Sequence, residues 1–533
     1  MLLVRKSNTS QIRSISQISN KYARLSYEIP ERYQNAFYLA NAAFFDSTSW
    51  FLHRAYEVAF PALKNDYRSR FKDEAVGDRR VHEKLENVIE VLDQCNSIID
   101  VRFPIRKDDG TLELIRGFRA HHGENIARSP CLGGLRIDEN ITRDHMKALS
   151  LLSTMKNCCM GIGMSGAHGG IKIDPRKYSK NELRTIVDLY ITELFNKGYC
   201  GHLDVIHPDI NTGQIEMQWI SESFAKCSGQ NMNVAAVGKP LAYGGLEDYE
   251  KTAALGALKA LDVFLEDVPT MDYMKSNVGM KNKKFIIQGL GKVGRPLALM
   301  LVEHGAICVG VKEQDAYLYD SKGIDLQELL KHKDETGSIE RYKLTKTDNP
   351  DSIFKEDCDI LVLSACHKSL VCYVAREVKA KIILEASDGP TTPTAHKILT
   401  TKSKLVIPDI YACSGSNVAS YLEYLRNLQQ MGVREETILK FSNETYGKII
   451  EKISMEDQKQ MAGGAHSKNV HTLFAPLDFH TTKSTIECIF TEMGEEILKN
   501  IRSHRLGTDA RTAAYIIVIK NMFEQIYNLK KLI

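Results

Sequence analysis

The stretch FIIQGLGKVG, residues 285–294, decides the fold of the second half of the chain. An apolar strand runs into a G-x-G-x-x-G turn, and a helical pattern follows over residues 295–303. Gly289 permits the tight turn, Gly291 lets backbone N–H groups approach a pyrophosphate, and Gly294 lets the helix pack on the strand. The stretch therefore predicts a dinucleotide-binding site at this turn.

The next predicted strand, residues 307–311, is followed by an acid that supports this interpretation. Glu313 lies 19 residues after Gly294, where a carboxylate accepts hydrogen bonds from the adenosine ribose hydroxyls. Such an acid favours NAD, whereas the neighbouring Lys312 would tolerate the 2′-phosphate of NADP. The expected cofactor is NAD or NADP.

Around this motif the sequence has the rhythm of a parallel sheet. Short β-branched runs separated by helix-length segments occur at 284–288, 307–311, 359–364, 381–384 and 404–407. Parallel strands must be joined by long crossovers, so this spacing predicts a doubly wound α/β domain. The turn-rich stretch GKPLAYGG at residues 238–245 marks its start, and mixed strands and helices precede it.

Composition limits the possible functions of the 533 residues. Lys and Arg number 70 against 67 Asp and Glu, and a net charge of +3 gives no basic surface for nucleic acid. No apolar run approaches the roughly 18 residues of a membrane-spanning helix, so no membrane insertion is expected. The 12 cysteines contain no C-x-x-C pair and are interpreted as free thiols, with no metal site expected.

The N-terminus has the composition of a targeting segment. Residues 1–27 contain five basic residues and no acid before Glu28. This pattern predicts a mitochondrial transit peptide at 1–27 and a mature protein in the mitochondrial matrix. The alternative interpretation is a basic tail on a cytosolic protein.

Three polar segments of the first half are CLGGLR at 131–136, SGAHGG at 165–170 and HPD at 207–209, and Lys156 precedes the second of them. With the dinucleotide motif they resemble the glutamate dehydrogenase family, in its animal mitochondrial form. The similarity extends from residue 35 to 533. It also covers FPIRKDDG (103–110), EASDGPTTP (385–393), VIPDIYACSG (406–415), SYLEYLRN (420–427) and DARTAAY (509–515).

The resemblance implies a domain plan and an assembly. Residues 35–240 would form the substrate-binding and assembly domain, and residues 241–427 the Rossmann nucleotide domain. Residues 428–480 would form a helical antenna, residues 481–533 the C-terminal helices, and the whole a homohexamer.

The resemblance also implies a reaction and its residues. L-Glutamate would be oxidised to 2-oxoglutarate and ammonium, with hydride transfer to the nicotinamide. Lys156 corresponds to the lysine that binds the α-carboxylate, and Asp209 to the aspartate that shuttles a proton. Gly134 and Ser420 correspond to substrate-binding positions, and Ser420 is the partner of a lysine that holds the distal carboxylate.

Five positions depart from the family pattern. Leu132 replaces the lysine for the distal carboxylate, and His168 replaces the catalytic lysine. Val237 stands where the family has threonine near the cofactor, and Asp388 and Cys413 stand where it has asparagine. Histidine remains able to act as a general base near neutral pH.

Three functions stay open on the sequence. The first is glutamate dehydrogenase with full or weakened activity. The second is a catalytically inactive paralog that serves the hexamer as a structural or regulatory subunit. The third is a dehydrogenase of a less polar amino acid, because leucine dehydrogenases also have leucine at the position of Leu132, although they keep the catalytic lysine.

Overall fold

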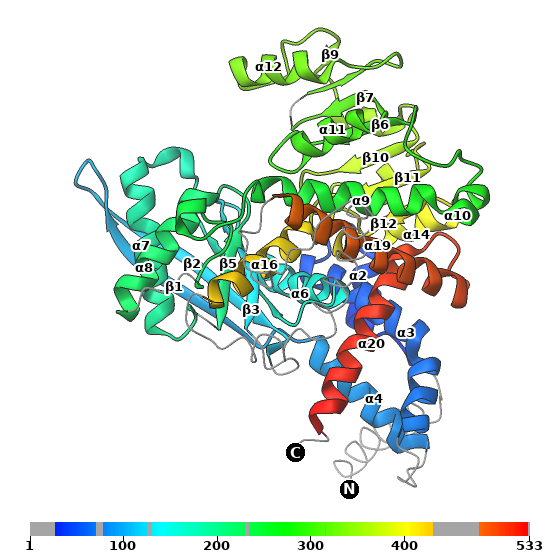
Figure 1. Cartoon of the computed structure of the whole chain (residues 1–533), viewed down its shortest axis with the longest axis horizontal. Coiled ribbons are helices and arrows are strands. Elements are labelled where there is room, and N and C mark those ends of the chain that lie inside the picture. The colour runs from blue at the N-terminus through cyan, green and yellow to red at the C-terminus, as the bar shows by residue number, and fades with distance from the viewer. Residues whose placement is uncertain are drawn as a thin grey trace, which may run out of the picture.

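The computed structural model describes residues 27–70, 78–124, 130–201, 203–229, 234–314, 316–429 and 479–530. Two sheets, each flanked by helices, make up these ranges (Figure 1). Residues 1–26 of the predicted transit peptide and residues 430–478 of the predicted antenna lie outside them. No helix of the described ranges is long and apolar enough to cross a membrane.

The first sheet has five strands in the order β1-β2-β4-β3-β5. Its strands are β1 (Ser97–Arg106), β2 (Leu112–His122), β3 (Cys131–Ile137), β4 (Ser165–Ile171) and β5 (Asp204–Pro208). β2 runs antiparallel to β1 and β4, whereas β3 runs parallel to β4 and β5. The helices of this half are α2 (Glu31–Tyr38), α3 (Phe44–Arg70), α4 (Asp78–Leu92), α6 (Arg143–Cys159), α7 (Lys180–Asn196) and α8 (Gln214–Ser228).

The second sheet has seven strands in the order β12-β11-β10-β6-β7-β8-β9. Its strands are β6 (Lys284–Gln288), β7 (Ile307–Lys312), β8 (Tyr317–Tyr319), β9 (Thr345–Lys346), β10 (Ile360–Leu363), β11 (Ile382–Glu385) and β12 (Leu405–Ile407). The five predicted strands are all present and pair in parallel with one another. The chain leaves β6 for β7 on one side and later adds β10 on the other, so β6 ends at the topological switch point where doubly wound folds bind ligands.

Helices cover both faces of this sheet. They are α9 (Thr252–Glu266), α10 (Val268–Tyr273), α11 (Gly294–Glu303), α12 (Leu326–Thr336), α13 (Cys372–Ala375), α14 (Pro393–Thr401), α15 (Asp409–Ala412) and α16 (Gly415–Gln429). The C-terminal helices α19 (Phe479–Ser503) and α20 (Ala510–Lys530) return to the core, where α19 packs on α9 and α20 on α3. The α/β class with a doubly wound second half is thus confirmed.

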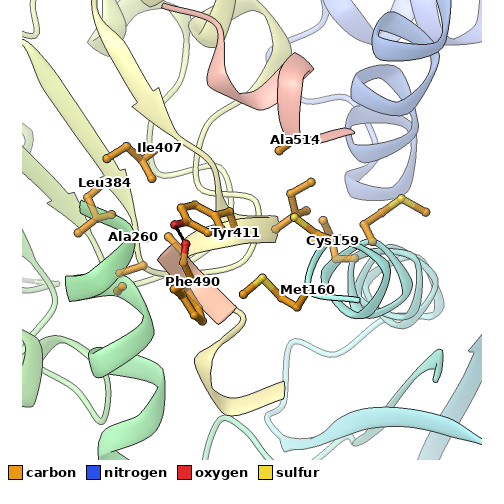
Figure 2. Packing of buried hydrophobic residues seen from close by; sticks show 14 of the residues in the cluster. Cys159, Met160, Ala260, Leu384, Ile407, Tyr411, Phe490 and Ala514 are labelled. Atoms are coloured by element: carbon orange, nitrogen blue, oxygen red, sulfur yellow. Dashed lines mark hydrogen bonds between the residues drawn. The ribbon is translucent and has the colours of Figure 1, made fainter. Parts of the chain in front are cut away.

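One apolar core joins the two halves (Figure 2). Cys159 at the end of α6 meets Tyr411 of α15 and Phe490 of α19, and all three side chains are buried. The Tyr411 hydroxyl donates a hydrogen bond to the backbone oxygen of Phe490 at 2.5 Å. Helix α6 also carries Lys156, so this packing fixes a predicted site residue against the nucleotide half.

Candidate active site between the two sheets

The glycine turn after β6 has the geometry that its sequence predicts. Gly289 has a φ of +91°, and a Cβ at Gly294 would lie 1.9 Å from the backbone oxygen of Gly289. At Gly291, apart from the glycine and its two chain neighbours, no atom of the described residues lies within 4 Å of the place a Cβ would take. Two glycines are therefore required by the turn itself, and the third leaves open space in front of the helix N-terminus for a ligand.

The acid after β7 lies directly beside this turn. Glu313 Oε1 accepts a hydrogen bond from the backbone N–H of Leu290 at 2.9 Å and from Lys333 Nζ at 2.5 Å. Lys312 is directed elsewhere, with its Nζ 3.3 Å from an oxygen of Asp351. The cation nearest to Glu313 is thus Lys333, which the sequence analysis did not single out because α12 carries it 20 residues further along the chain.

A cavity of about 500 Å³ opens between the two halves and reaches the glycine turn. Its lining includes Lys156, His168 and Asp209 from the first half together with Gly291 and Asp388 from the second. The fold therefore brings five of the predicted site residues into one cleft, although they are far apart in the sequence.

The charged groups of this cleft form one connected network. Asp388 accepts hydrogen bonds from Lys156 Nζ at 2.5 Å and from Arg136 Nη2 at 3.0 Å. The Arg136 Nε also donates to Asp209 Oδ2 at 2.5 Å. Lys156 and Arg136 come from the first half and Asp388 from the second, so these contacts join the two halves across the cleft. The two cations are balanced by the two carboxylates.

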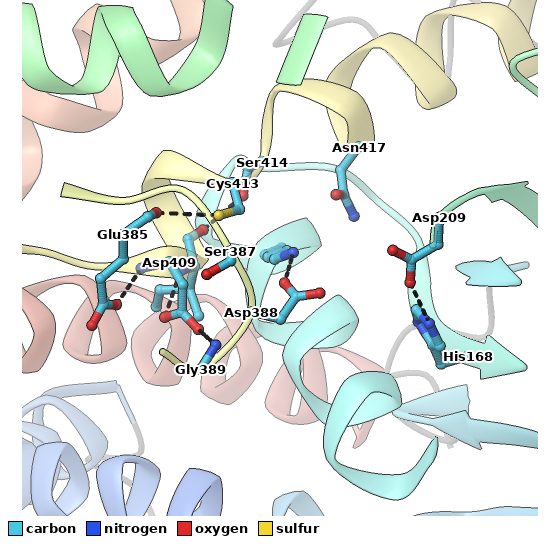
Figure 3. Close-up of polar contacts among 12 residues, drawn as sticks. His168, Asp209, Glu385, Ser387, Asp388, Gly389, Asp409, Cys413, Ser414 and Asn417 are labelled. Atoms are coloured by element: carbon cyan, nitrogen blue, oxygen red, sulfur yellow. Dashed lines mark hydrogen bonds and ion pairs between the residues drawn. The ribbon is translucent and has the colours of Figure 1, made fainter. Parts of the chain in front are cut away.

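His168 lies at the first-half end of this network, directed at Asp209 (Figure 3). Its Nε2 is 2.9 Å from Asp209 Oδ2. Burial lowers the pKa of His168, although Asp209 opposes the shift. The imidazole is therefore neutral at pH 7 and keeps a lone pair that can accept a proton.

The remaining groups of the network hold their charges. Burial favours the neutral form of Lys156, but Asp388 outweighs it and raises the lysine pKa. Burial likewise opposes ionisation of Asp388 and Asp209, yet Lys156 and Arg136 hold the pKa of Asp388 below its usual range, and Arg136 and His168 do the same for Asp209. At pH 7 the site is a pair of carboxylates held by two cations, beside a neutral base.

Comparison with known proteins gives this geometry a family. Residues 244–475 match the family described as Glutamate/Leucine/Phenylalanine/Valine dehydrogenase, and residues 95–226 match its dimerisation domain. The mitochondrial glutamate dehydrogenase of Dictyostelium discoideum is 30% identical over 451 residues, which is 83% of this chain and 88% of that protein. This chain belongs to the Glu/Leu/Phe/Val dehydrogenase family.

Other relatives agree with this assignment. The NAD-specific glutamate dehydrogenase of Staphylococcus aureus is 31% identical over 354 residues, covering 66% of this chain and 82% of that protein. Among solved structures, a hetero-hexameric glutamate dehydrogenase from Thermus thermophilus, in its Leu-bound form, superposes with a TM-score of 0.71 at 25% identity over 95% of this chain and 99% of that one. The predicted resemblance to glutamate dehydrogenases is confirmed at the level of the family.

The positions predicted for the distal carboxylate do not line the cleft within the described residues. Leu132 and Ser420 are both fully buried. The Ser420 hydroxyl instead lies 2.6 Å from the hydroxyl of Tyr249, which does line the cavity. Leu132 therefore offers the cleft no polar group, and the Ser420 hydroxyl is already paired with Tyr249.

Three other predicted positions are Gly134, Val237 and Cys413, and of these Cys413 lines the cavity. A Cβ on Gly134 would lie 2.8 Å from His168 Cε1, so glycine is needed there to seat the imidazole. Val237 is fully buried, and its N–H donates to the backbone oxygen of Ile206 at 2.9 Å. The Cys413 thiol lines the cavity and donates to the backbone oxygen of Glu385 at 3.2 Å.

The sequence analysis gave no role to Arg136, the residue that joins both carboxylates. Its signal was available, because side chains alternate along a strand. Arg136 lies two residues after Gly134 on β3, so both residues are on the same face of the sheet. Gly134 lies against His168, so this face is the one that meets the site. An arginine on the site face of a strand is a candidate ligand for anions.

Proposed function

We propose that this chain catalyses NAD(P)-linked oxidation of L-glutamate to 2-oxoglutarate and ammonium, with weakened affinity for the anionic substrate. The observation that carries the proposal is the convergence of Lys156, His168 and Asp209 on a cleft that reaches the glycine turn. A lysine, a neutral base and a carboxylate are the groups that such a reaction requires at the α-carbon.

Each group has a role that follows from its charge. Lys156 binds the α-carboxylate, and Asp209 accepts the proton that leaves the substrate nitrogen. His168 is neutral and therefore able to take a proton from the water that adds to the imine carbon. A bound nicotinamide supplies the acceptor for the hydride on the α-carbon.

Asp388 explains why the affinity for a carboxylate would be weak. Its oxygen already lies 2.5 Å from Lys156 Nζ, so an incoming α-carboxylate must displace it. A hydrogen bond to a charged group contributes roughly 1.5–3 kcal/mol, which corresponds to about a 10- to 100-fold change in affinity. Asp388 thus acts as an internal competitor of the substrate.

Asp388→Asn is expected to tighten binding of 2-oxoglutarate by about 10- to 100-fold, because the amide keeps the size of the side chain and removes its charge. The measurement is a calorimetric titration of the full chain in the presence of NADH. Asp357→Asn is the matched control, since it removes a carboxylate of the same half whose side chain is 80% exposed. Equal affinities of wild type and Asp388→Asn would refute the competitor role.

Activity assays of the wild type and of the same variant test for turnover. NADH formation from glutamate, and its consumption with 2-oxoglutarate and ammonium, are measured for the wild type and for Asp388→Asn. Turnover that appears or increases in the variant supports the proposal. Absence of turnover in both, with tight binding of 2-oxoglutarate to the variant, favours the second candidate.

That second candidate is a non-catalytic subunit of a mixed hexamer. The ion pair of Lys156 with Asp388 favours it, because it occupies the cation that would bind the substrate. The Thermus thermophilus relative is a hetero-hexameric glutamate dehydrogenase. Co-expression with an active glutamate dehydrogenase subunit of the same organism tests it. A mixed hexamer with altered activity supports this candidate, and separate elution of the two chains excludes it.

A third candidate is a dehydrogenase of a less polar amino acid. The buried Leu132 favours it, because no lysine stands at this position to bind a distal carboxylate. Leucine, valine and phenylalanine tested beside glutamate in the NADH assay distinguish this candidate, which requires faster turnover of one of the three.

The glycine turn and Glu313 carry the proposal that NAD or NADP is the cofactor. Glu313→Ala is expected to weaken NAD binding about 10- to 100-fold, because the ribose hydroxyls lose a charged acceptor. NADP binding should fall less, since the substitution frees Lys333 for the 2′-phosphate. Asp334→Ala, which removes an exposed partner of Arg295, is the control in the fluorescence titration. An unchanged NAD affinity in Glu313→Ala would contradict this role.

The assembly and location remain part of this proposal. A homohexamer, a helical antenna at 428–480 and import into the mitochondrial matrix fit the family and the mitochondrial relative from Dictyostelium discoideum. Cell fractionation with an N-terminal antibody and mass determination of the native complex test them. A full-length cytosolic monomer would contradict both the hexamer and the import.

A further inference from the structure

Three metal-ligating side chains meet at one end of the first sheet, where β2 ends and β3 begins. They are His121 at the end of β2, Glu124 two residues beyond that strand, and Cys131 at the start of β3. One ligand atom from each lies within 4.8 Å of the others. His121 Nδ1 is 2.6 Å from Glu124 Oε1, and Cys131 Sγ is 3.8 Å from the same oxygen. The family resemblance assigns no role to this cluster.

A second carboxylate orients the histidine from behind. His121 Nε2 lies 2.8 Å from Asp204 Oδ2. Asp204 is itself bound by the fully buried Arg119, whose Nε donates to Oδ2 at 2.8 Å. A histidine that gives one ring nitrogen to a carboxylate and turns the other to its ligand partners has the arrangement typical of metal-bound histidines.

Ring stacking and burial hold the cluster in place and leave it open to an ion on one side. The ring of Tyr199 stacks on His121 with centroids 4.7 Å apart. His121 and Cys131 are buried, whereas the Glu124 side chain is 39% exposed. An ion would therefore reach the buried nitrogen and sulfur past the carboxylate of Glu124.

We propose that His121, Glu124 and Cys131 bind one Zn²⁺ ion per chain. Imidazole nitrogen, thiolate sulfur and carboxylate oxygen are together the ligand set that zinc prefers, and a water molecule would complete four-coordination. Binding would use the neutral imidazole and the thiolate, with the thiol proton leaving to solvent, because only deprotonated ligands coordinate the ion. The sequence spacing concealed this site because its ligands come from strands separated by β4.

The site would anchor the strand that leads into the cleft. Cys131 begins β3, and Gly134 on the same strand lies against His168. Zinc bound at Cys131 would hold the start of this strand to the end of β2 without touching substrate. The ion would thus have a structural role, independent of whether the cleft is catalytic.

Titration of the metal-stripped full chain with zinc chloride tests the proposal. We expect binding of one ion per chain, measured by calorimetry. Co²⁺ bound in place of zinc should show a thiolate-to-metal charge-transfer band. Binding without that band, or no stoichiometric binding, would overturn the proposal.

Variants identify the ligands. Glu124→Gln should weaken zinc binding at least tenfold. Because the Glu124 side chain is 39% exposed, the metal-free variant should still fold, so the result does not depend on a buried substitution. Cys131→Ser should abolish the cobalt band, whereas Cys372→Ser, on α13 of the other half, should leave it unchanged. Wild-type affinity in Glu124→Gln, or a retained band in Cys131→Ser, would refute the assignment.

Discussion

His168→Gln is expected to lower kcat/KM for glutamate about 10²- to 10⁴-fold, the range for loss of a general base. The amide keeps the polar contact with Asp209 but cannot take a proton from water. NADH affinity should stay unchanged, because the glycine turn and Glu313 are untouched. The measurement is the initial rate of NADH formation, with Asp388→Asn as the background if wild-type turnover is slow.

The pH profile separates a base from a merely structural histidine. Burial lowers the pKa of His168, so its neutral form persists below the ordinary histidine pKa of about 6.5. Activity should therefore hold from pH 8 down past 6.5 and fall only as the pH drops through the lowered pKa. This acid limb should vanish in His168→Gln and persist in His304→Gln, a matched change on the exposed C-cap of α11. Wild-type kcat/KM in His168→Gln would show that the base lies elsewhere.

The strands of the nucleotide half were predictable because they are buried on both faces. β6 and β10 are continuous apolar runs with buried residues throughout their centres. Such runs can be recognised in the sequence without knowing which strands they pair with. β8 and β9 extend the same sheet by antiparallel pairing and contain only 3 and 2 residues. Such short strands carry too little pattern to be distinguished from loops.

The site was predictable in its members but not in its connections. The resemblance named Lys156, His168, Asp209 and Asp388, and the fold brings all four to one cleft. The pairing of Lys156 with Asp388 joins residues 232 positions apart, and nothing local in either sequence segment encodes it. The complete burial of Leu132 was equally hidden, because alternation gives the face of a strand but not what covers that face.

A buried ion network behind the Asp388 loop gives the largest expected effect on stability. Arg511 of α20 donates from Nη1 to Asp409 Oδ1 at 2.9 Å and from Nη2 to Glu385. All three side chains are at most 2% exposed. The guanidinium also lies over the ring of Phe51, with Cζ 4.3 Å from its centroid. The C-terminal helix thereby supplies the countercharge for two carboxylates at the end of β11 and the start of α15.

Arg511→Met is expected to lower the free energy of unfolding by about 3–5 kcal/mol, because it leaves two buried carboxylates without a cation. Arg502→Met on α19 is the control. Its pair with Asp267 has an arginine side chain that is 51% exposed and should contribute at most about 1 kcal/mol. Urea unfolding followed by circular dichroism measures both variants.

The pH dependence of that loss tests its cause. Burial already raises the pKa of Glu385, and removing Arg511 raises it further, because the arginine opposes this shift in the wild type. Below that pKa the carboxyl is neutral and no longer needs a cation, so the deficit of Arg511→Met should shrink as the pH falls from 8 to 5. A deficit that is the same at both values, or one no larger than that of Arg502→Met, would mean that α20 is held by its apolar face alone. In that case the ion network would not be what fixes the loop carrying Asp388.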